Sequence, residues 1–367
     1  MQERAHSYVS FLAGMACVVI IIAGMRAAAS ILNPILMALL ILFISLPLTR
    51  WLEARGVRRG LAVALTIAAV IGTIVAVLLL IGSSLSPVIA GLPDYQAGFD
   101  AQMAALESAL AARGLDVTGA ANALGLNGGR VFELVATLVG GIISVLGSIG
   151  FIVMYFIFML IEAAGFPKKL RQGLGTNPAL LQASRFTKSV SDFMVIKAWL
   201  GFLAAAGDVI LLTILGVNYA MLWGVLSFLL SFIPSIGYIL ALIPPLLVAF
   251  TQHGPATAII VFCGYWLING VIDSVIGPRY LGEGLDLSTV VTIVAAFFWG
   301  WVLGPIGAFL ALPITVAIKM LILEHYADTR WVAAAIASES SVLAAAPSAP
   351  GPPAQTQPID GVGDRRW

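Results

Sequence analysis

Eight apolar runs constrain this chain more than any other feature of its sequence. Six of them are close to the roughly 20 residues that cross the hydrocarbon layer of a bilayer as a helix. They lie near residues 11–25, 31–48, 61–82, 134–161, 193–216 and 255–277. Because 60% of the 367 residues are hydrophobic and only 10% are charged, a soluble core could not bury them all. The sequence predicts an all-α polytopic membrane protein.

The two remaining runs, 219–250 and 288–322, are too long to cross a bilayer as straight helices. At about 1.5 Å per residue each would extend nearly 50 Å, against a hydrocarbon thickness of about 30 Å. The first run contains Pro234, Pro244 and Pro245, and each proline removes one backbone hydrogen bond from a helix. Both runs must therefore tilt, break or turn back on themselves.

Two topologies remain open at this stage. If both long runs are re-entrant hairpins, the chain has six full spans; if both cross the bilayer, it has eight. Both versions leave the C-terminal tail on the same side, but they differ in the side on which His253 and Arg279 lie. Labelling these two positions would decide between them.

Basic residues indicate the orientation. The loop after the second span holds Arg55, Arg58 and Arg59, and the loop 163–192 carries five Lys and Arg residues, whereas 83–132 carries two. Loops rich in Lys and Arg stay on the cytoplasmic side. We therefore expect both termini to be cytoplasmic.

The chain divides into four predicted regions. These are N-terminal membrane helices at 1–82, an extracytoplasmic amphipathic segment at 83–132, a core with the broken runs at 133–330, and a disordered cytoplasmic tail at 331–367. The second region is expected to form a small helix outside the bilayer, and the Pro-, Ala- and Gly-rich tail has little to bury. The N-terminus also resembles a signal peptide, but the next apolar run follows almost at once, as a helical hairpin requires.

The two long runs resemble each other. PSIGYILALIP begins at Pro234 and PIGAFLALP begins at Pro305, and both contain a proline, a glycine, an aromatic residue and a second proline. Paired, interrupted apolar segments are typical of transporter binding sites, because broken helices leave backbone groups free to hold a solute. A simple proline kink is the alternative. The repeated pattern favours a functional break.

Few ionisable or amide side chains lie at membrane depth. Asp208 lies well inside the fifth span, and Lys197 precedes it by about three turns, too far for a direct contact. Asn269 and Asp273 are four residues apart and share a helix face, with Ser274 next to them. These residues are candidates for a solute or ion pathway. Hydrogen bonding between neighbouring helices is the alternative role.

Several function classes are disfavoured. A net charge of +1 provides no basic surface for nucleic acid. The chain lacks GxxxxGK[ST], HExxH and GxSxG motifs, so an enzyme is not expected. Cys17 and Cys263 both lie in apolar runs, which disfavours a disulfide. We expect no cofactor and no metal centre.

The chain resembles the autoinducer-2 exporter family of PerM-like permeases over most of residues 30–325. The resemblance rests on three stretches. They are NPILMALLILFISLPL before the basic loop, LGVNYAMLWGVLSFLLSFIPSIGYILALIPPLL, and GPRYLGEGLDLSTVVTIVAAFFWGWVLGPIGAFLALPITVAIK.

The resemblance implies a multi-pass inner-membrane transporter that assembles as a homo-oligomer, with a pentamer expected. Members are proposed to export autoinducer-2, and others to exchange sodium for protons. The family's P-x-x-G hairpin corresponds to Pro234 and Gly237, and its second element to Gly304, Gly307 and Pro313. Many relatives carry Gln or Glu in the span before the G-P-R turn, where this chain has Asn269, Asp273 and Ser274.

These observations support a hypothesis of secondary transport. A solute site would lie near the bilayer midplane between the two broken runs, and the carboxylates would take up a proton or a sodium ion. The partners would be a small solute or ion and the lipid bilayer. The alternatives are a sodium/proton antiporter of the same family and a non-transporting scaffold that acts through its tail; no ring of like charges supports a channel.

Overall fold

The computed structural model describes residues 2–112, 147–174, 178–234, 236–281 and 287–320, and residues 129, 133, 137, 140, 141 and 336 singly. At 2–11, 110, 164–186, 278 and 281 it describes the backbone alone. The predicted tail at 331–367 lies outside these ranges except for residue 336. The predicted span at 134–161 is described continuously only from residue 147.

Every element in the described ranges is a helix, which confirms the all-α fold class. The α-helices are α1 (Gln2–Ala27), α2 (Ala29–Ala54), α3 (Arg59–Ala111), α6 (Ile149–Leu174), α7 (Pro178–Ile214), α8 (Ala220–Leu230), α9 (Gly237–His253), α10 (Pro255–Val271), α11 (Gly277–Leu281), α12 (Thr289–Leu303), α13 (Pro305–Phe309) and α14 (Ala311–Ile318). A π-helical turn, η1 (Ile272–Ile276), continues α10. Four of the described helices are long and apolar enough to cross a membrane: 29–54, 59–109, 187–214 and 255–276.

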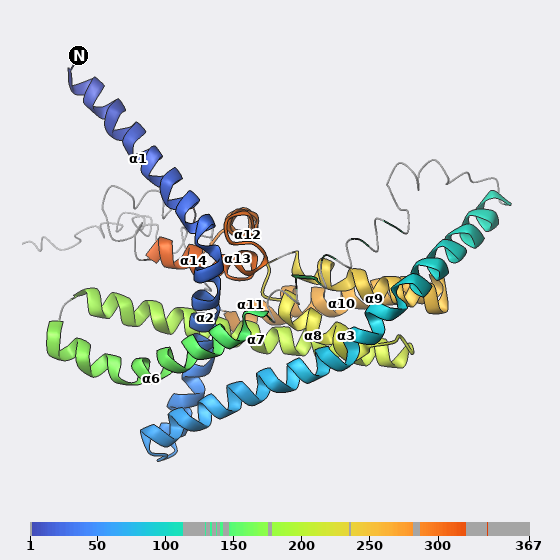
Figure 1. Cartoon of the computed structure of the whole chain (residues 1–367), viewed down its shortest axis with the longest axis horizontal. Coiled ribbons are helices and arrows are strands. Elements are labelled where there is room, and N and C mark those ends of the chain that lie inside the picture. Colours follow the sequence, from blue (N-terminus) through green and yellow to red (C-terminus); the bar gives the residue numbers. More distant parts are fainter. Residues whose placement is uncertain are drawn as a thin grey trace, which may run out of the picture.

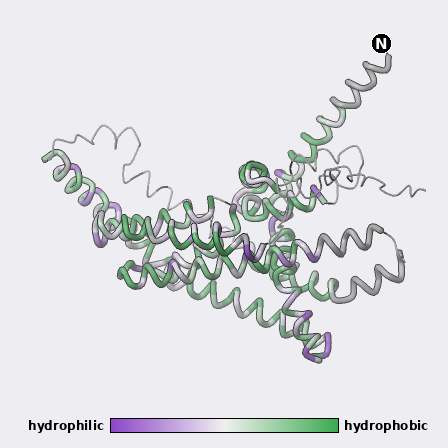
Figure 2. Tube along the Cα trace, turned by 180° about the vertical axis from the view of Figure 1, so that it is seen from behind, coloured by the Kyte–Doolittle hydropathy of each residue, from purple (hydrophilic) through white to green (hydrophobic). Residues whose placement is uncertain are grey.

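The helices form one elongated assembly. In Figure 1, α3 and the helices α7 to α10 run along the long axis, and α2 runs across this direction and contacts α3, α6 and α7. The pair α12 and α13 lies beside α2. Figure 2 shows hydrophilic residues gathered at the α2–α3 turn and near the far end of α3, while the helices between are mostly hydrophobic. This distribution fits a bilayer around the middle of the assembly.

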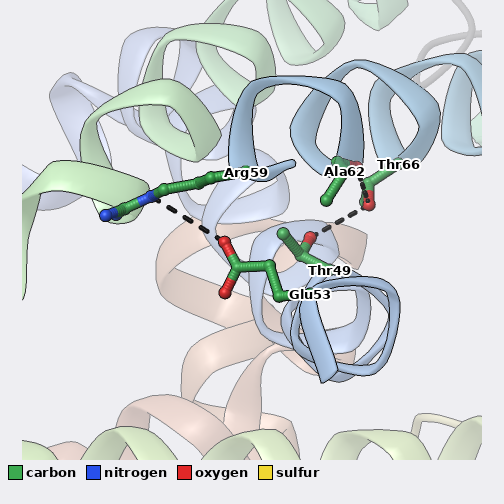
Figure 3. Close-up of polar contacts among 5 residues, drawn as sticks. All are labelled: Thr49, Glu53, Arg59, Ala62 and Thr66. Carbon is green, nitrogen blue, oxygen red and sulfur yellow. Dashed lines mark hydrogen bonds and ion pairs between the residues drawn. The ribbon is translucent and has the colours of Figure 1, made fainter. Parts of the chain in front are cut away.

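The turn between α2 and α3 carries the basic loop. Thr49 donates a hydrogen bond of 3.0 Å to Thr66, which itself donates to the carbonyl of Ala62, and Glu53 pairs with Arg59 at 3.8 Å (Figure 3). Thr49 and Thr66 are both buried. The two helices are therefore held together at this turn by side chains as well as by apolar packing.

Helix α3 is longer than expected. The sequence predicts a span at 61–82 and a separate short helix beyond it, but α3 continues without interruption to Ala111, through Pro87 and Pro93. The far part of α3 packs on the end of α9, where Phe99 and Phe250 lie 5.3 Å apart between ring centroids. An alanine-rich helix with a packing partner tolerates the hydrogen bonds that two prolines remove.

The first long run turns back on itself. Helices α8 and α9 are 11 and 17 residues long, about 16 and 25 Å, so neither spans a full hydrocarbon layer alone. The two ends of the run meet: Gln252 accepts a hydrogen bond from the Asn218 amide at 3.2 Å, and His253 lies 3.2 Å from the Gly216 carbonyl. We call α8, α9 and residues 231–236 between them the first hairpin.

Only one of the three prolines lies in the break of the first hairpin. Pro234 is in the turn, whereas Pro244 and Pro245 are buried inside α9. The turn closes tightly, because the Cα of Gly237 packs directly against the Leu230 carbonyl and leaves no room for a Cβ. The glycine, as much as the proline, makes the hairpin possible.

The second long run is also interrupted. Gly304 has a φ of 73° and separates α12 from α13, and Gly307 packs against the Trp299 carbonyl as Gly237 packs against Leu230. We call α12, α13 and α14, with the residues between them, the second hairpin. Across it, Trp299 donates a hydrogen bond of 3.1 Å to Thr315. These contacts confirm the prediction that both long runs break and resemble each other.

The two hairpins touch at their turns. Phe232 of the first and Phe309 of the second stack with ring centroids 4.6 Å apart. The surrounding apolar cluster also includes Leu40 and Phe43 of α2 and Val190 of α7. The hairpins are thus held against each other and against the long helices.

Ser191 connects α7 to α2, and its loss should destabilise the fold measurably. Its hydroxyl is buried and donates a hydrogen bond of 2.6 Å to the Phe43 carbonyl. Ser191→Ala is expected to lower the free energy of unfolding by about 1–2 kcal/mol. Thermal unfolding in detergent would measure this effect. Ser83→Ala removes an exposed hydroxyl that bonds within its own helix, and should have little effect; equal losses would contradict the assignment.

Candidate functional site

A pocket lies where the first hairpin meets α7 and α10. It is a small pocket that is partly open to the outside. Three elements supply its walls: α7, the turn of the first hairpin, and the segment from α10 into η1. The lining residues are Lys197, Leu200, Gly201, Ala204, Ser231, Ile233, Tyr238, Asn269, Ile272 and Asp273. We call it the hairpin pocket.

An ion pair lies in the wall of the hairpin pocket. The Lys197 Nζ is 3.5 Å from the Asp273 Oδ1, and the two side chains are 16% and 50% exposed. From the sequence, Lys197 could be related only to Asp208, which is too far along the same helix for a contact. A lysine in an apolar span indicates a functional candidate, but its ion-pair partner, Asp273, lies on another helix.

A π-helical turn shapes this wall. Asn269 lies in the last turn of α10, and Asp273 lies about one turn later, inside η1. Both side chains line the pocket, as their four-residue spacing predicts. A π-turn widens a helix locally and is frequent at functional sites. Ser274, the third predicted residue here, is exposed on η1 and does not line the pocket.

Behind the pocket lies a group of buried polar residues, which we call the interior cluster: Asp208, Ser227, Tyr265 and Asn269. Asp208 is fully buried on α7, and the Asn269 amide donates to it over a long contact of 3.5 Å. Ser227 of α8 neighbours both Asp208 and Tyr265. Asn269 belongs to the cluster and to the pocket wall, and it therefore connects the two.

Ser227 and Tyr265 were not identified from the sequence. Tyr265 lies four residues before Asn269 and so shares its helix face, which was the one available signal. Ser227 is the one hydroxyl residue of the apolar helix α8, but its role depends on α8 packing against α7 and on its proximity to Tyr265 of α10, which local spacing does not reveal.

The turn of the first hairpin contributes side chains rather than free amides. Pro234 and Gly237 lie in the turn, flanked by the pocket residues Ile233 and Tyr238. The amides of residues 231, 232, 233, 236 and 237 all donate to nearby backbone carbonyls. The expectation that this break leaves backbone N–H groups for a solute is therefore wrong for these residues, because local turns satisfy them.

The predicted residues of the second hairpin lie elsewhere. Gly304, Gly307 and Pro313 do not line the hairpin pocket, and Pro313 lies inside α14. The Asn33 side chain donates a hydrogen bond of 3.0 Å to the Leu303 carbonyl just before the break. The Leu303 carbonyl at this helix end is thus satisfied by α2, and the second hairpin contacts the first through Phe309 and the surrounding apolar cluster.

No group of three His, Cys, Asp or Glu side chains that could hold a metal ion occurs within the described residues. Cys17 and Cys263 are both exposed and unpaired. The chemistry of the pocket is therefore that of an ion pair, hydroxyls and amides.

Comparisons with known proteins agree with this architecture. The family described as "AI-2E family transporter" matches residues 15–327. The chain is 34% identical over 303 residues to the AI-2 transport protein TqsA of Escherichia coli K12, which covers 82% of this chain and 88% of TqsA.

Two further relatives are putative transport proteins. YhhT of Escherichia coli K12 is 29% identical over 312 residues, covering 83% of this chain and 88% of YhhT. A protein of Haemophilus influenzae is 31% identical over 316 residues, covering 84% of this chain and 91% of its own length. The predicted resemblance is confirmed. The chain belongs to the AI-2E transporter family and is a multi-pass membrane transport protein.

Proposed function

We propose that this transporter moves a small polar solute through the hairpin pocket, driven by an ion gradient, with an autoinducer-2-like signal as the leading candidate. The observation that carries the proposal is the pocket itself, in which an interrupted run, a π-turn and an ion pair converge. Interrupted helices next to polar side chains are typical of transporter sites. The name of TqsA, an AI-2 transport protein, suggests the solute.

The side chains of the pocket suit a solute rich in hydroxyl groups. Lys197 and Tyr238 can donate hydrogen bonds, Asp273 can accept them, and Ser231 and Asn269 can do both. The opposite charges of Lys197 on α7 and Asp273 on η1 balance each other, so the pocket carries no net charge from this pair. A solute that inserts between Lys197 and Asp273 would replace their 3.5 Å contact with its own hydrogen bonds.

Asp208 and Asp273 are the carboxylates that could take up a proton or a sodium ion as the site opens to alternate sides. A buried carboxylate in a membrane segment is costly and is a functional candidate for that reason. The interior cluster also favours the second candidate, a sodium/proton antiporter of the same family. The two candidates differ in whether the pocket carries an organic solute at all.

The scaffold alternative has less support, because the family and its named relatives are transport proteins. Deleting residues 340–367 should leave flux largely unchanged if the chain is a transporter.

We further propose an inner-membrane location with both termini in the cytoplasm, which the basic loops favour. A homo-oligomer, a pentamer by family resemblance, completes the proposal.

Asp273→Asn tests the pocket. We expect solute flux to fall about tenfold or more, corresponding to at least about 1.4 kcal/mol, because the ion pair and an acceptor are lost. The measurement is uptake of autoinducer-2 into proteoliposomes under an imposed proton gradient, and separately under a sodium gradient. Glu53→Gln is the matched control, since it neutralises a carboxylate of another ion pair far along the chain. Unchanged flux in Asp273→Asn, with normal expression, would remove the residue from the mechanism.

A further inference from the structure

Three oxygen atoms of the interior cluster are buried without a hydrogen-bond partner in the described structure: Asp208 Oδ2, Ser227 Oγ and Tyr265 Oη. They come from three different helices, α7, α8 and α10. Ser227 neighbours both other residues, and Tyr265 lies close enough to Asp208 to be affected by its charge, so the three side chains lie close together. Buried polar groups are nearly always paired, and three unpaired oxygens in one place need an explanation.

The charge of Asp208 has little compensation within the described protein. The side chain is 0% exposed and receives one long contact, from the Asn269 amide. The nearest lysine on the same helix, Lys197, is engaged with Asp273. An isolated carboxylate in such surroundings would carry a large desolvation penalty, so it must be neutralised.

We propose that Asp208, Ser227 and Tyr265 bind a sodium ion through these three oxygens. A carboxylate and two hydroxyls are the oxygen ligands that hard cations prefer. The single carboxylate matches a monovalent cation, because a divalent ion would leave one positive charge uncompensated in the apolar interior. This inference rests on the proposed function, since it assigns the ion that would drive the transporter.

The position of the site links the ion to the hairpin pocket. Asn269 contacts Asp208 on one side and lines the pocket on the other, so this one side chain connects the carboxylate to the pocket wall. Ser227 lies three residues before Leu230, whose carbonyl packs on Gly237 at the closed turn. An ion that holds Ser227 against α7 and α10 would therefore favour the closed hairpin.

The test measures sodium binding to the purified full-length protein in detergent. Sodium chloride is titrated against choline chloride at constant ionic strength and mildly alkaline pH, so that protons do not compete with sodium for the Asp208 carboxylate. Binding is followed by calorimetry and by the midpoint of thermal unfolding. We expect saturable binding and a sodium-dependent rise in the midpoint. Asp208→Asn should abolish both.

Two milder variants keep the test decisive if Asp208→Asn fails to fold. Ser227→Ala and Tyr265→Phe should each weaken sodium binding about tenfold. In choline, Tyr265→Phe should unfold no earlier than the wild type, because the lost hydroxyl has no partner there. Thr213→Val and Tyr155→Phe are the controls. The Thr213 hydroxyl donates to the Val209 carbonyl within α7. Tyr155 of α6 packs in a separate apolar cluster that α2, α3 and α6 form.

Absence of sodium binding to the wild type overturns the site, and so does binding that is equal in wild type, Ser227→Ala and Tyr265→Phe. The first result would indicate a carboxyl that stays protonated. Failure of this inference is distinguishable from failure of the proposed function, because solute uptake under a proton gradient in sodium-free buffer is measured separately. Sodium binding without any solute flux would retain the site and favour the antiporter.

Discussion

Replacing Gly237 by alanine is expected to prevent the first hairpin from closing. The added Cβ would overlap the Leu230 carbonyl, which is backbone and cannot rotate away. Overpacking of this kind costs about 1–3 kcal/mol where neighbours can shift, and a backbone neighbour shifts least. We expect a large loss of monodisperse protein on size-exclusion chromatography, a lower thermal midpoint and loss of flux. Gly307→Ala should behave alike, because its Cβ would meet the Trp299 carbonyl.

The matched control is Gly270→Ala, on α10. A Cβ at Gly270 meets no atom within 4 Å, and alanine is favoured over glycine inside a helix by about 0.5–1 kcal/mol. This variant should be as stable as the wild type or more so. If Gly237→Ala and Gly270→Ala gave the same yield, midpoint and flux, the close approach of α8 and α9 would not be essential.

Single-cysteine labelling should place residues 253 and 279 on opposite sides of the membrane. The contacts of Gly216 with His253 and of Asn218 with Gln252 return the first hairpin to the end where it started. The segment 255–276 then crosses to the other end. A membrane-impermeant maleimide should therefore label His253→Cys and Asn218→Cys from one side and Arg279→Cys from the other, an all-or-none difference.

The labelling needs a background without native thiols, since Cys17 and Cys263 are both exposed. Cys17→Ser and Cys263→Ser provide it, and their flux is checked first. From the basic loops we expect residue 253 on the extracytoplasmic side. Labelling of His253→Cys and Asn218→Cys from opposite sides would show that the first run crosses the membrane, and would contradict the hairpin.

Much of the fold could be predicted because the bilayer imposes lengths. Runs of 32 and 35 residues, 219–250 and 288–322, exceed the thickness of the hydrocarbon layer, and the structure breaks both. The positions of the breaks were harder to predict. Pro244 and Pro245 look like breaking points in the sequence, yet α9 contains both, because packing around a helix compensates for missing hydrogen bonds.

The candidate site was predicted in part. Asp208, Asn269 and Asp273 stand out because charged and amide side chains are rare in apolar spans, and all three lie in or behind the hairpin pocket. The pairing of Lys197 with Asp273 and the roles of Ser227 and Tyr265 could not be predicted. Each depends on which helices are neighbours, and local spacing contains no information on that.

By itself the sequence determined the helical membrane class, the two interrupted runs and the family, since hydrophobic length and motif order are properties of the chain alone. Only the tertiary structure decided which side chains meet. The pocket and the interior cluster each join residues from helices far apart in the sequence. Their geometry depends on how α8 and α10 pack on α7 and α9, and the closed turn at Gly237 holds α8 against α9.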